Sequence, residues 1–216
     1  MGVTVFLCGW GGGEIFFKNL FIFFNIFFYY LKIHICIYKK MLNRNLDFEM
    51  IKKLELSFEQ HKELKKFCEK IGIKYLSTPF DLKSIDFLDS IDIDFFKIPS
   101  GEITNLPFLR KIESKGRPII LSTGMSNMQE IRNAINQLQM VGTSKKDISI
   151  LHCTSEYPAP FSDVNLNAMS SIKKEFKVNV GYSDHTLGVE VSFAAVSLGA
   201  QIIEKHITLE KNLVGP

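Results

Sequence analysis

The chain has 216 residues, of which 46% are hydrophobic and 23% are charged, a balance typical of a globular protein with one large domain or two small ones. The formal net charge is only +3, and residues 47–216 are close to neutral, which excludes the basic face that nucleic-acid binding requires. The four cysteines (Cys8, Cys36, Cys68 and Cys153) show neither a CxxC pair nor a zinc-ligand spacing, and this pattern indicates reduced thiols in a cytoplasmic protein.

Residues 1–46 differ in composition from the rest of the chain, because they hold eight of the 19 Phe residues and a single acidic residue. Three interpretations are open. Residues 15–31 could form a membrane span, although Lys18, Asn19 and Asn25 interrupt it. The segment could be a soluble part of the core, or it could be AT-rich DNA translated in the wrong frame. We expect the last, with residues 1–46 outside the folded domain and residues 47–216 forming it.

From residue 47 onward, helices and strands alternate. Ser57 and Gln60 form a capping box that opens a helix ending at Gly72, and a strand over 73–80 follows. A second capping box, Ser126 to Gln129, opens a helix that ends at Gly142. The remaining predicted helices cover about 81–90, 105–115, 165–176 and 187–198, and the remaining strands cover 94–100, 118–124, 148–154, 179–185 and 200–208.

Six strands separated by helices predict a parallel sheet with right-handed crossovers. An open doubly wound sheet and a partial (β/α)8 barrel both fit this order. Polar residues end all six strands, and a barrel gathers such ends around one mouth whereas an open sheet uses one switch point. The pattern therefore favours a partial TIM barrel of about six of its eight strand–helix units.

Two histidines lie at the ends of consecutive predicted strands. His185 follows the strand over 179–185, and His206 shares a face with Glu204 in the strand over 200–208. Parallel neighbours are about 4.8 Å apart, so the two imidazoles could hold one divalent metal. A hydrogen-bonded histidine pair without metal is the alternative. Glu204 would then be either a partner of the metal ligands or a satisfied acid in the interior.

One ammonium and several hydroxyls lie at the other strand ends and suit a phosphate or carboxylate. They are Lys97, Thr78, Ser100, Ser122 and Ser183. Solvated strand ends are the alternative. Glu102 could accept hydrogen bonds from sugar hydroxyls or be a solvated loop acid. Cys153 follows His152, and the alternation of its strand turns Cys153 away from the mouth, which argues against a nucleophile.

Five motifs at regular spacing resemble the N-acetylneuraminate (sialic acid) synthase family, which includes the legionaminate and pseudaminate synthases. The motifs are KIPSGE (97–102), LSTGM (121–125), LHCTSEYPAP (151–160), GYSDHTLG (181–188) and EKHITLEKNLVGP (204–216). The resemblance runs from about Asp47 to Pro216.

The resemblance implies a (β/α)8 barrel that condenses phosphoenolpyruvate with an N-acetylated amino sugar to a nine-carbon 2-keto acid and phosphate. It implies Mn²⁺ or Mg²⁺ on His185 and His206, which with Lys97 are the expected catalytic residues. Phosphoenolpyruvate contacts are implied for Thr78, Lys97, Ser100, Ser122 and Ser183, and sugar contacts for Glu102, Ser155 and Tyr157. Ser155 stands where the resemblance leads us to expect Asn in sialic acid enzymes, which favours a legionaminate-type sugar.

The sequence also departs from the family pattern. Residues 1–46 contain neither the AEAGVNHNG-like motif nor the KFQ-like motif of the first two strands, which carry a catalytic Glu and a second phosphate-binding Lys. The resemblance implies a C-terminal antifreeze-like domain that completes a domain-swapped homodimer, and the sequence shows none. We therefore expect an inactive fragment. The alternatives are a non-catalytic remnant that binds metal and anion, a membrane-anchored barrel, and a metal-dependent hydrolase, which would need more His and Asp ligands.

Overall fold

The structure is a computed structural model that describes residues 3–8, 55–140 and 142–207. The chain divides into two compact units, Met1–Tyr75 with Lys205–Pro216, and Leu76–Glu204. All predicted site residues except His206 belong to the second unit.

The first unit contains the strand β1 (Val3–Cys8) and the helix α3 (Phe58–Lys70). The predicted capping box is confirmed, since Ser57 Oγ accepts from the Gln60 amide and Gln60 Oε1 accepts from the Ser57 amide. His61 on α3 contacts the Tyr75 hydroxyl through Nδ1. The proposed membrane span at 15–31 lies outside the described residues, and within them no helix is long and apolar enough to cross a membrane.

The second unit is built on the strands that follow. They are β2 (Phe96–Ile98), β3 (Ile119–Ser122), β4 (Ile148–Cys153), β5 (Asn179–Asp184) and β6 (Ile202–Ile207), which passes into the first unit after Glu204. The strand order is β1-β6-β5-β4-β3-β2, and the pairs from β2 to β5 are parallel. This confirms the predicted parallel α/β fold of a partial barrel, and the structure shows a half-barrel.

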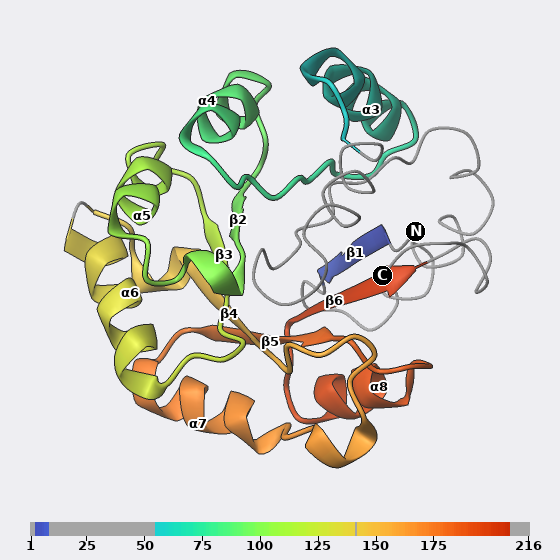
Figure 1. Cartoon of the computed structure of the whole chain (residues 1–216), viewed down its shortest axis with the longest axis vertical. Coiled ribbons are helices and arrows are strands. Elements are labelled where there is room, and N and C mark those ends of the chain that lie inside the picture. The colour runs from blue at the N-terminus through green and yellow to red at the C-terminus, as the bar shows by residue number, and fades with distance from the viewer. Residues whose placement is uncertain (1–2, 9–54, 141, 208–216) are drawn as a thin grey trace, which may run out of the picture. The chain divides into compact units, whose positions relative to one another are not determined.

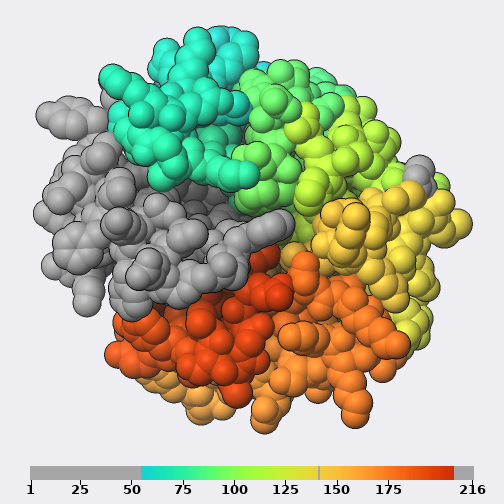
Figure 2. Space-filling view, turned by 180° about the vertical axis from the view of Figure 1, so that it is seen from behind, coloured from blue at the N-terminus to red at the C-terminus, as the bar shows by residue number. Residues whose placement is uncertain are grey.

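Five helices alternate with these strands and lie on their outer side (Figure 1). They are α4 (Leu82–Ser90), α5 (Leu106–Glu113), α6 (Met128–Met140), α7 (Asn167–Phe176) and α8 (Glu190–Ser197). Asp81 caps α4 and Asn105 caps α5 through side-chain oxygens. From behind, the green-to-yellow surface of α4 to α6 meets the orange-to-red surface of α7 and α8 (Figure 2).

Register separates the inner face of the sheet from the face that carries the helices. Lys97 pairs with Ile120, and Cys153 pairs with Ser183, so these side chains share the inner face. The opposite face is mostly apolar and packs under the helices, although it also carries His152 and Asp184. Its fully buried members include Phe96, Ile98, Ile119, Leu121 and Tyr182. Polar side chains on the inner face are therefore the ones available to a site.

Two predicted elements differ in the structure. Residues 73–80 form no strand, because a strand requires a ladder of backbone hydrogen bonds with a neighbour and this extended segment has none. The second capping box is shifted by one residue. Asn127 Oδ1 accepts from the amides of Gln129 and Glu130, and Glu130 Oε2 accepts from the Asn127 amide. The Glu carboxylate is also the better partner for the positive end of the α6 dipole.

Candidate active site

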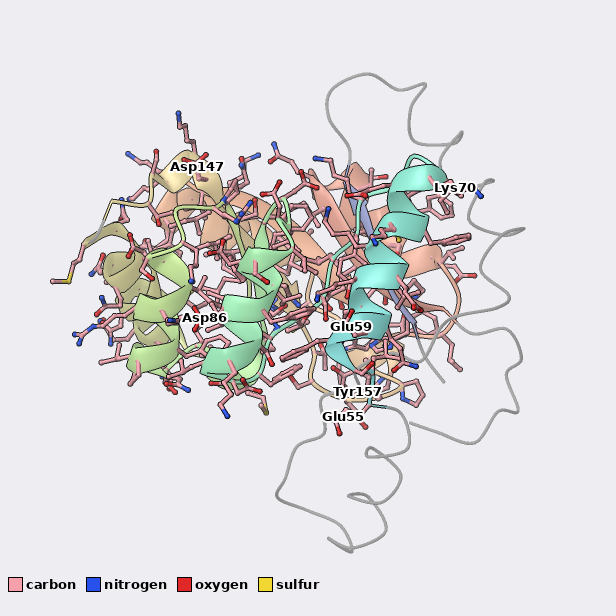
Figure 3. The ribbon with its side chains drawn as sticks, turned by 90° about the horizontal axis from the view of Figure 1, so that it is seen from above. Glu55, Glu59, Lys70, Asp86, Asp147 and Tyr157 are labelled. Atoms are coloured by element: carbon pink, nitrogen blue, oxygen red, sulfur yellow. The ribbon has the colours of Figure 1, made fainter. Side chains whose placement is uncertain are left out.

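The predicted site residues of the second unit lie near or beyond the carboxyl ends of the strands. Asp147 directly precedes β4 and Tyr157 lies four residues beyond its end, and Figure 3 shows the two at opposite ends of the structure. The end marked by Tyr157 is therefore the carboxyl end. Parallel strands carry their active sites there.

A buried ion pair occupies the inner face. Lys97 Nζ on β2 lies 2.8 Å from Glu204 Oε2 and 3.1 Å from Oε1 on β6. Ser183 Oγ on β5 donates to Glu204 Oε1 at 2.6 Å. The three side chains are 5%, 6% and 1% exposed, so water contributes little to their solvation. Of the two roles left open for Glu204, the structure supports the satisfied interior acid.

The charge state of Glu204 follows from these contacts. Burial alone would raise the pKa of its carboxyl group, but the nearby Lys97 ammonium and the hydrogen bonds from Lys97 and Ser183 outweigh burial and lower the pKa. Glu204 is therefore ionised at neutral pH. The site holds a salt bridge rather than a neutral acid.

His185 is held in one tautomer beside this pair. Its Nδ1 lies 2.6 Å from the backbone oxygen of Thr154, and a carbonyl oxygen can only accept. Nδ1 therefore carries the proton and the lone pair lies on Nε2, which is 3.2 Å from Ser183 Oγ. Burial lowers the pKa of His185 and keeps the ring neutral. The Tyr157 ring lies over it, with the ring centroids 4.1 Å apart.

A neutral imidazole with a fixed tautomer suits a metal ligand, because the metal needs the lone pair and a backbone carbonyl orients the ring. Among the described residues, no group of three or more His, Cys, Asp or Glu side chains could hold a metal. His206 lies on the part of β6 that belongs to the first unit, and its side chain is exposed. Its pairing with His185 stays a prediction.

Ser100, Gly124 and Cys153 form a second cluster on the inner face. Ser100 Oγ accepts the Gly124 amide at 2.9 Å and lies 3.5 Å from Cys153 Sγ. A side chain at position 124 would collide with Ser155 Oγ and come within 2.9 Å of Cys153 Sγ. A larger residue at position 124 would therefore force the Ser155 and Cys153 side chains to move.

The predicted orientation of Cys153 is wrong. Alternation places Cys153 and His152 on opposite faces of β4, and we expected Cys153 to point away from the mouth. The register with Ser183 instead places Cys153 on the inner face. His152 instead contacts Tyr182 on the helix side, with ring centroids 5.7 Å apart. Burial raises the pKa of the Cys153 thiol and keeps the thiol protonated. A protonated thiol is a poor nucleophile, so Cys153 remains unsuited to that role although it faces inward.

Ser122 is the polar group on the inner face that lacks a partner. It ends β3, is 3% exposed, and its buried Oγ makes no hydrogen bond among the described residues. An unsatisfied buried hydroxyl costs about 1–3 kcal/mol. A ligand oxygen would offset that cost.

The other predicted site residues lie in loops. Thr78 is half-buried and lies outside any helix or strand. Glu102 ends the short 3-10 helix η1 (Ser100–Glu102) and accepts from Asn105 Nδ2 at 2.6 Å. Ser155 is half-buried and Tyr157 is 58% exposed, both in the loop after β4. Sequence reasoning missed the Thr154 carbonyl, because a backbone acceptor leaves no signal in residue type.

Known proteins resemble the chain over most of its length. A profile described as the NeuB family matches residues 35–216. An N,N'-diacetyllegionaminic acid synthase of Campylobacter jejuni is 54% identical over 82% of this chain and 53% of its own. A synthase of the same description from Legionella pneumophila is 52% identical over 78% of this chain and 48% of its own.

The fold gives the same relationship. The crystal structure of the spore coat polysaccharide biosynthesis protein SpsE of Bacillus subtilis superposes with a TM-score of 0.72 and 35% identity, covering 78% of this chain and 47% of that one. The chain spans about half the length of the curated relatives it matches. Since the family profile covers most of the sequence and the half-barrel matches a solved relative, the chain belongs to the NeuB family.

Proposed function

We propose that this chain binds phosphoenolpyruvate at the inner face of the half-barrel as part of a nonulosonic acid synthase. The observation that carries the proposal is Ser122, whose buried hydroxyl lacks a partner among the described residues and lies on the same face of the sheet as Lys97, one strand away. Phosphoenolpyruvate has two anionic groups, and such groups are bound by a fixed cation together with short hydroxyl donors.

The side chains of the inner face would bind the anionic groups of phosphoenolpyruvate in different ways. Lys97 supplies the positive charge, and its salt bridge to Glu204 holds the ammonium in place. Ser100 Oγ already accepts the Gly124 amide, so its own proton can be donated to a ligand. Ser183 on β5 would reach the anion by turning its single hydroxyl proton from Glu204 Oε1 to the ligand, and Thr78 would contribute from the segment before α4.

The second substrate would be an N-acetylated amino sugar. Relatives named N,N'-diacetyllegionaminic acid synthase favour a 2,4-diacetamido-trideoxyhexose over N-acetylmannosamine. Glu102, Ser155 and Tyr157 lie on the loops after β2 and β4, where they could contact that sugar. Bound by His185 and His206, Mn²⁺ or Mg²⁺ would supply a Lewis acid for the aldehyde oxygen of the open-chain sugar.

The proposed condensation balances with one water molecule. The C2–C3 double bond of phosphoenolpyruvate supplies the electron pair with which C3 attacks the aldehyde carbon, and water adds at the electron-poor C2 while its released proton goes to the aldehyde oxygen. The tetrahedral intermediate then forms the 2-keto group by losing inorganic phosphate together with the proton of the C2 hydroxyl. Because residues 1–46 contain neither of the family motifs that carry the catalytic Glu and the second Lys, we propose that the chain alone binds phosphoenolpyruvate without turnover. A non-catalytic remnant with the same anion site is the second candidate.

Calorimetry and a product assay test the proposal. Phosphoenolpyruvate should bind the purified chain, and Ser122→Ala should weaken binding about tenfold, in line with a lost hydrogen bond to a charged group. Ser114→Ala is the matched control, since Ser114 Oγ only bonds the Lys111 carbonyl at the end of α5. Equal affinity in Ser122→Ala and wild type would overturn the site. Nine-carbon acid formed with Mn²⁺ and either sugar would overturn the inactivity.

A further inference from the structure

A buried carboxylate at the end of β5 has no role in the proposed function. Asp184 is 0% exposed and follows Ser183, so its side chain points to the helix side of the sheet rather than to the inner face. Burying a carboxylate is costly unless hydrogen bonds replace its hydration. The contacts of Asp184 therefore show what the charge is for.

Asp184 accepts hydrogen bonds from residues that follow His185. Oδ1 accepts from the Thr186 amide at 2.9 Å and from Thr186 Oγ1 at 2.7 Å. Oδ2 accepts from Ser192 Oγ on α8 at 2.5 Å. One carboxylate thus joins the strand end, the residue after His185 and the helix that follows. Bonds to a charged acceptor are about twice as strong as neutral ones.

His185 is held from its other side by the loop after β4. Its backbone oxygen accepts from the Ala159 amide at 2.9 Å, and its Nδ1 donates to Thr154 O at 2.6 Å. The ring can meet Thr154 only if the backbone of His185 runs in a defined direction. The residues on both sides of His185 set that direction, because Asp184 precedes His185 and its carboxylate holds Thr186, which follows His185.

We infer that Asp184 is the positioning residue of His185, holding its backbone so that Nδ1 meets Thr154 O and the lone pair stays on Nε2. The use of that lone pair by a metal rests on the proposed function, whereas the orientation itself does not. A purely structural role would stabilise the loop without affecting the tautomer. The two roles are therefore separable by experiment.

The test compares two serines on the same helix in the full chain. Ser192→Ala removes the bond to Asp184, and Ser197→Ala is the control because Ser197 Oγ bonds only the Phe193 carbonyl in α8. Asp184→Asn keeps an acceptor for Thr186 and removes the charge. Circular dichroism confirms that each variant folds, and His185→Asn identifies the His185 signals.

Long-range ¹H–¹⁵N spectra at pH 8 report the tautomer of His185 directly. Wild type and Ser197→Ala should show a proton on Nδ1, whereas Ser192→Ala and Asp184→Asn should show a mixture of both tautomers. Mn²⁺ titration should give a Kd at least tenfold weaker for Ser192→Ala than for Ser197→Ala, the range for partners of metal ligands.

The outcomes separate the inference from the proposed function. If wild type binds no Mn²⁺, the metal role fails and the tautomer spectra alone decide the positioning role. Folded Ser192→Ala and Asp184→Asn variants that keep the wild-type tautomer would overturn the inference, whatever their metal affinity.

Discussion

Removing either partner of the Lys97–Glu204 pair should destabilise the protein far more than removing both. Glu204→Leu removes the Lys97 contacts at 2.8 and 3.1 Å, in a site where Lys97 is only 5% exposed. Breaking a buried ion pair by removing one of its partners costs about 3–5 kcal/mol. Lys97→Met leaves Glu204 with the Ser183 bond, so its cost should be about 3 kcal/mol, at the lower end of that range.

The double variant should recover most of this loss. With both charges gone, apolar side chains of similar volume avoid the desolvation penalty, and such replacements are often nearly neutral. We expect the double variant to lie within about 2 kcal/mol of wild type, which gives a coupling energy of about 3 kcal/mol or more. Urea unfolding of the four proteins, followed by far-UV circular dichroism, measures this cycle.

A surface pair of equal length is the control. Lys111 Nζ and Asp86 Oδ1 also lie 2.8 Å apart, but their side chains are 34% and 51% exposed. Their coupling should be close to zero, because exposed pairs gain little. Costs for Lys97 and Glu204 that add to within about 0.5 kcal/mol would show that the two residues do not act as a buried pair.

The pH dependence gives the same pair a second readout. Because the pKa of Glu204 is lowered in the folded state, its stabilisation is complete above the unfolded value of about 4.3 and is lost as the pH falls through the folded value. The stability difference between wild type and Glu204→Leu should therefore shrink below about pH 4. An unchanged difference down to pH 3 would show that Glu204 is not an ionised partner.

Three further predictions concern residues around the core. Glu113 is 5% exposed, its Oε2 has no hydrogen-bond partner among the described residues, and burial raises the pKa of its carboxyl group. Glu113→Gln should therefore stabilise the protein by about 1 kcal/mol in urea unfolding at pH 7 and lose that advantage at low pH, where Glu113 is protonated. No gain in stability at pH 7 would contradict this prediction. Gly124→Ala should lower the free energy of unfolding by about 1–3 kcal/mol. Adding Ser155→Ala should recover part of this loss, since Ser155 Oγ is the atom nearest to the new methyl group. Equal melting temperatures of wild type and Gly124→Ala would argue against the collision. Cys153 is 6% exposed, and burial raises the pKa of its thiol, so it should react slowly with iodoacetamide at pH 7.5. Mass spectrometry should find Cys153 alkylated only after urea unfolds the chain. Rapid alkylation of the folded chain would contradict the buried placement.

Sequence patterns predicted the elements well because capping and periodicity are local properties. The helices at Ser57 and Asn105 begin where their caps are, and five predicted strands have partners in the sheet. The prediction of a strand at 73–80 was wrong, because strand pairing depends on a neighbouring strand that the local sequence does not describe. Alternation likewise placed Cys153 and His152 on opposite faces, yet it could not say which face of β4 points inward. Only the register of Cys153 against Ser183 decides that.

The candidate site was predictable in its residue types and less so in its connections. Lys97, Ser122, Ser183 and His185 were found from strand ends and from the family resemblance. The direct bonds from Lys97 to Glu204 join residues 107 positions apart, a contact that spacing along the chain does not reveal. The Thr154 carbonyl, which fixes the tautomer of His185, was also invisible because every residue has one.

A crystal structure of the chain soaked with phosphoenolpyruvate would show whether the ligand occupies the inner face of the half-barrel. An anionic group of the ligand should lie within hydrogen-bond distance of Ser122 Oγ and contact Lys97 Nζ while the bond from Lys97 to Glu204 persists. Ligand density elsewhere on the molecule, with Ser122 Oγ unpartnered as before, would contradict this placement of the ligand.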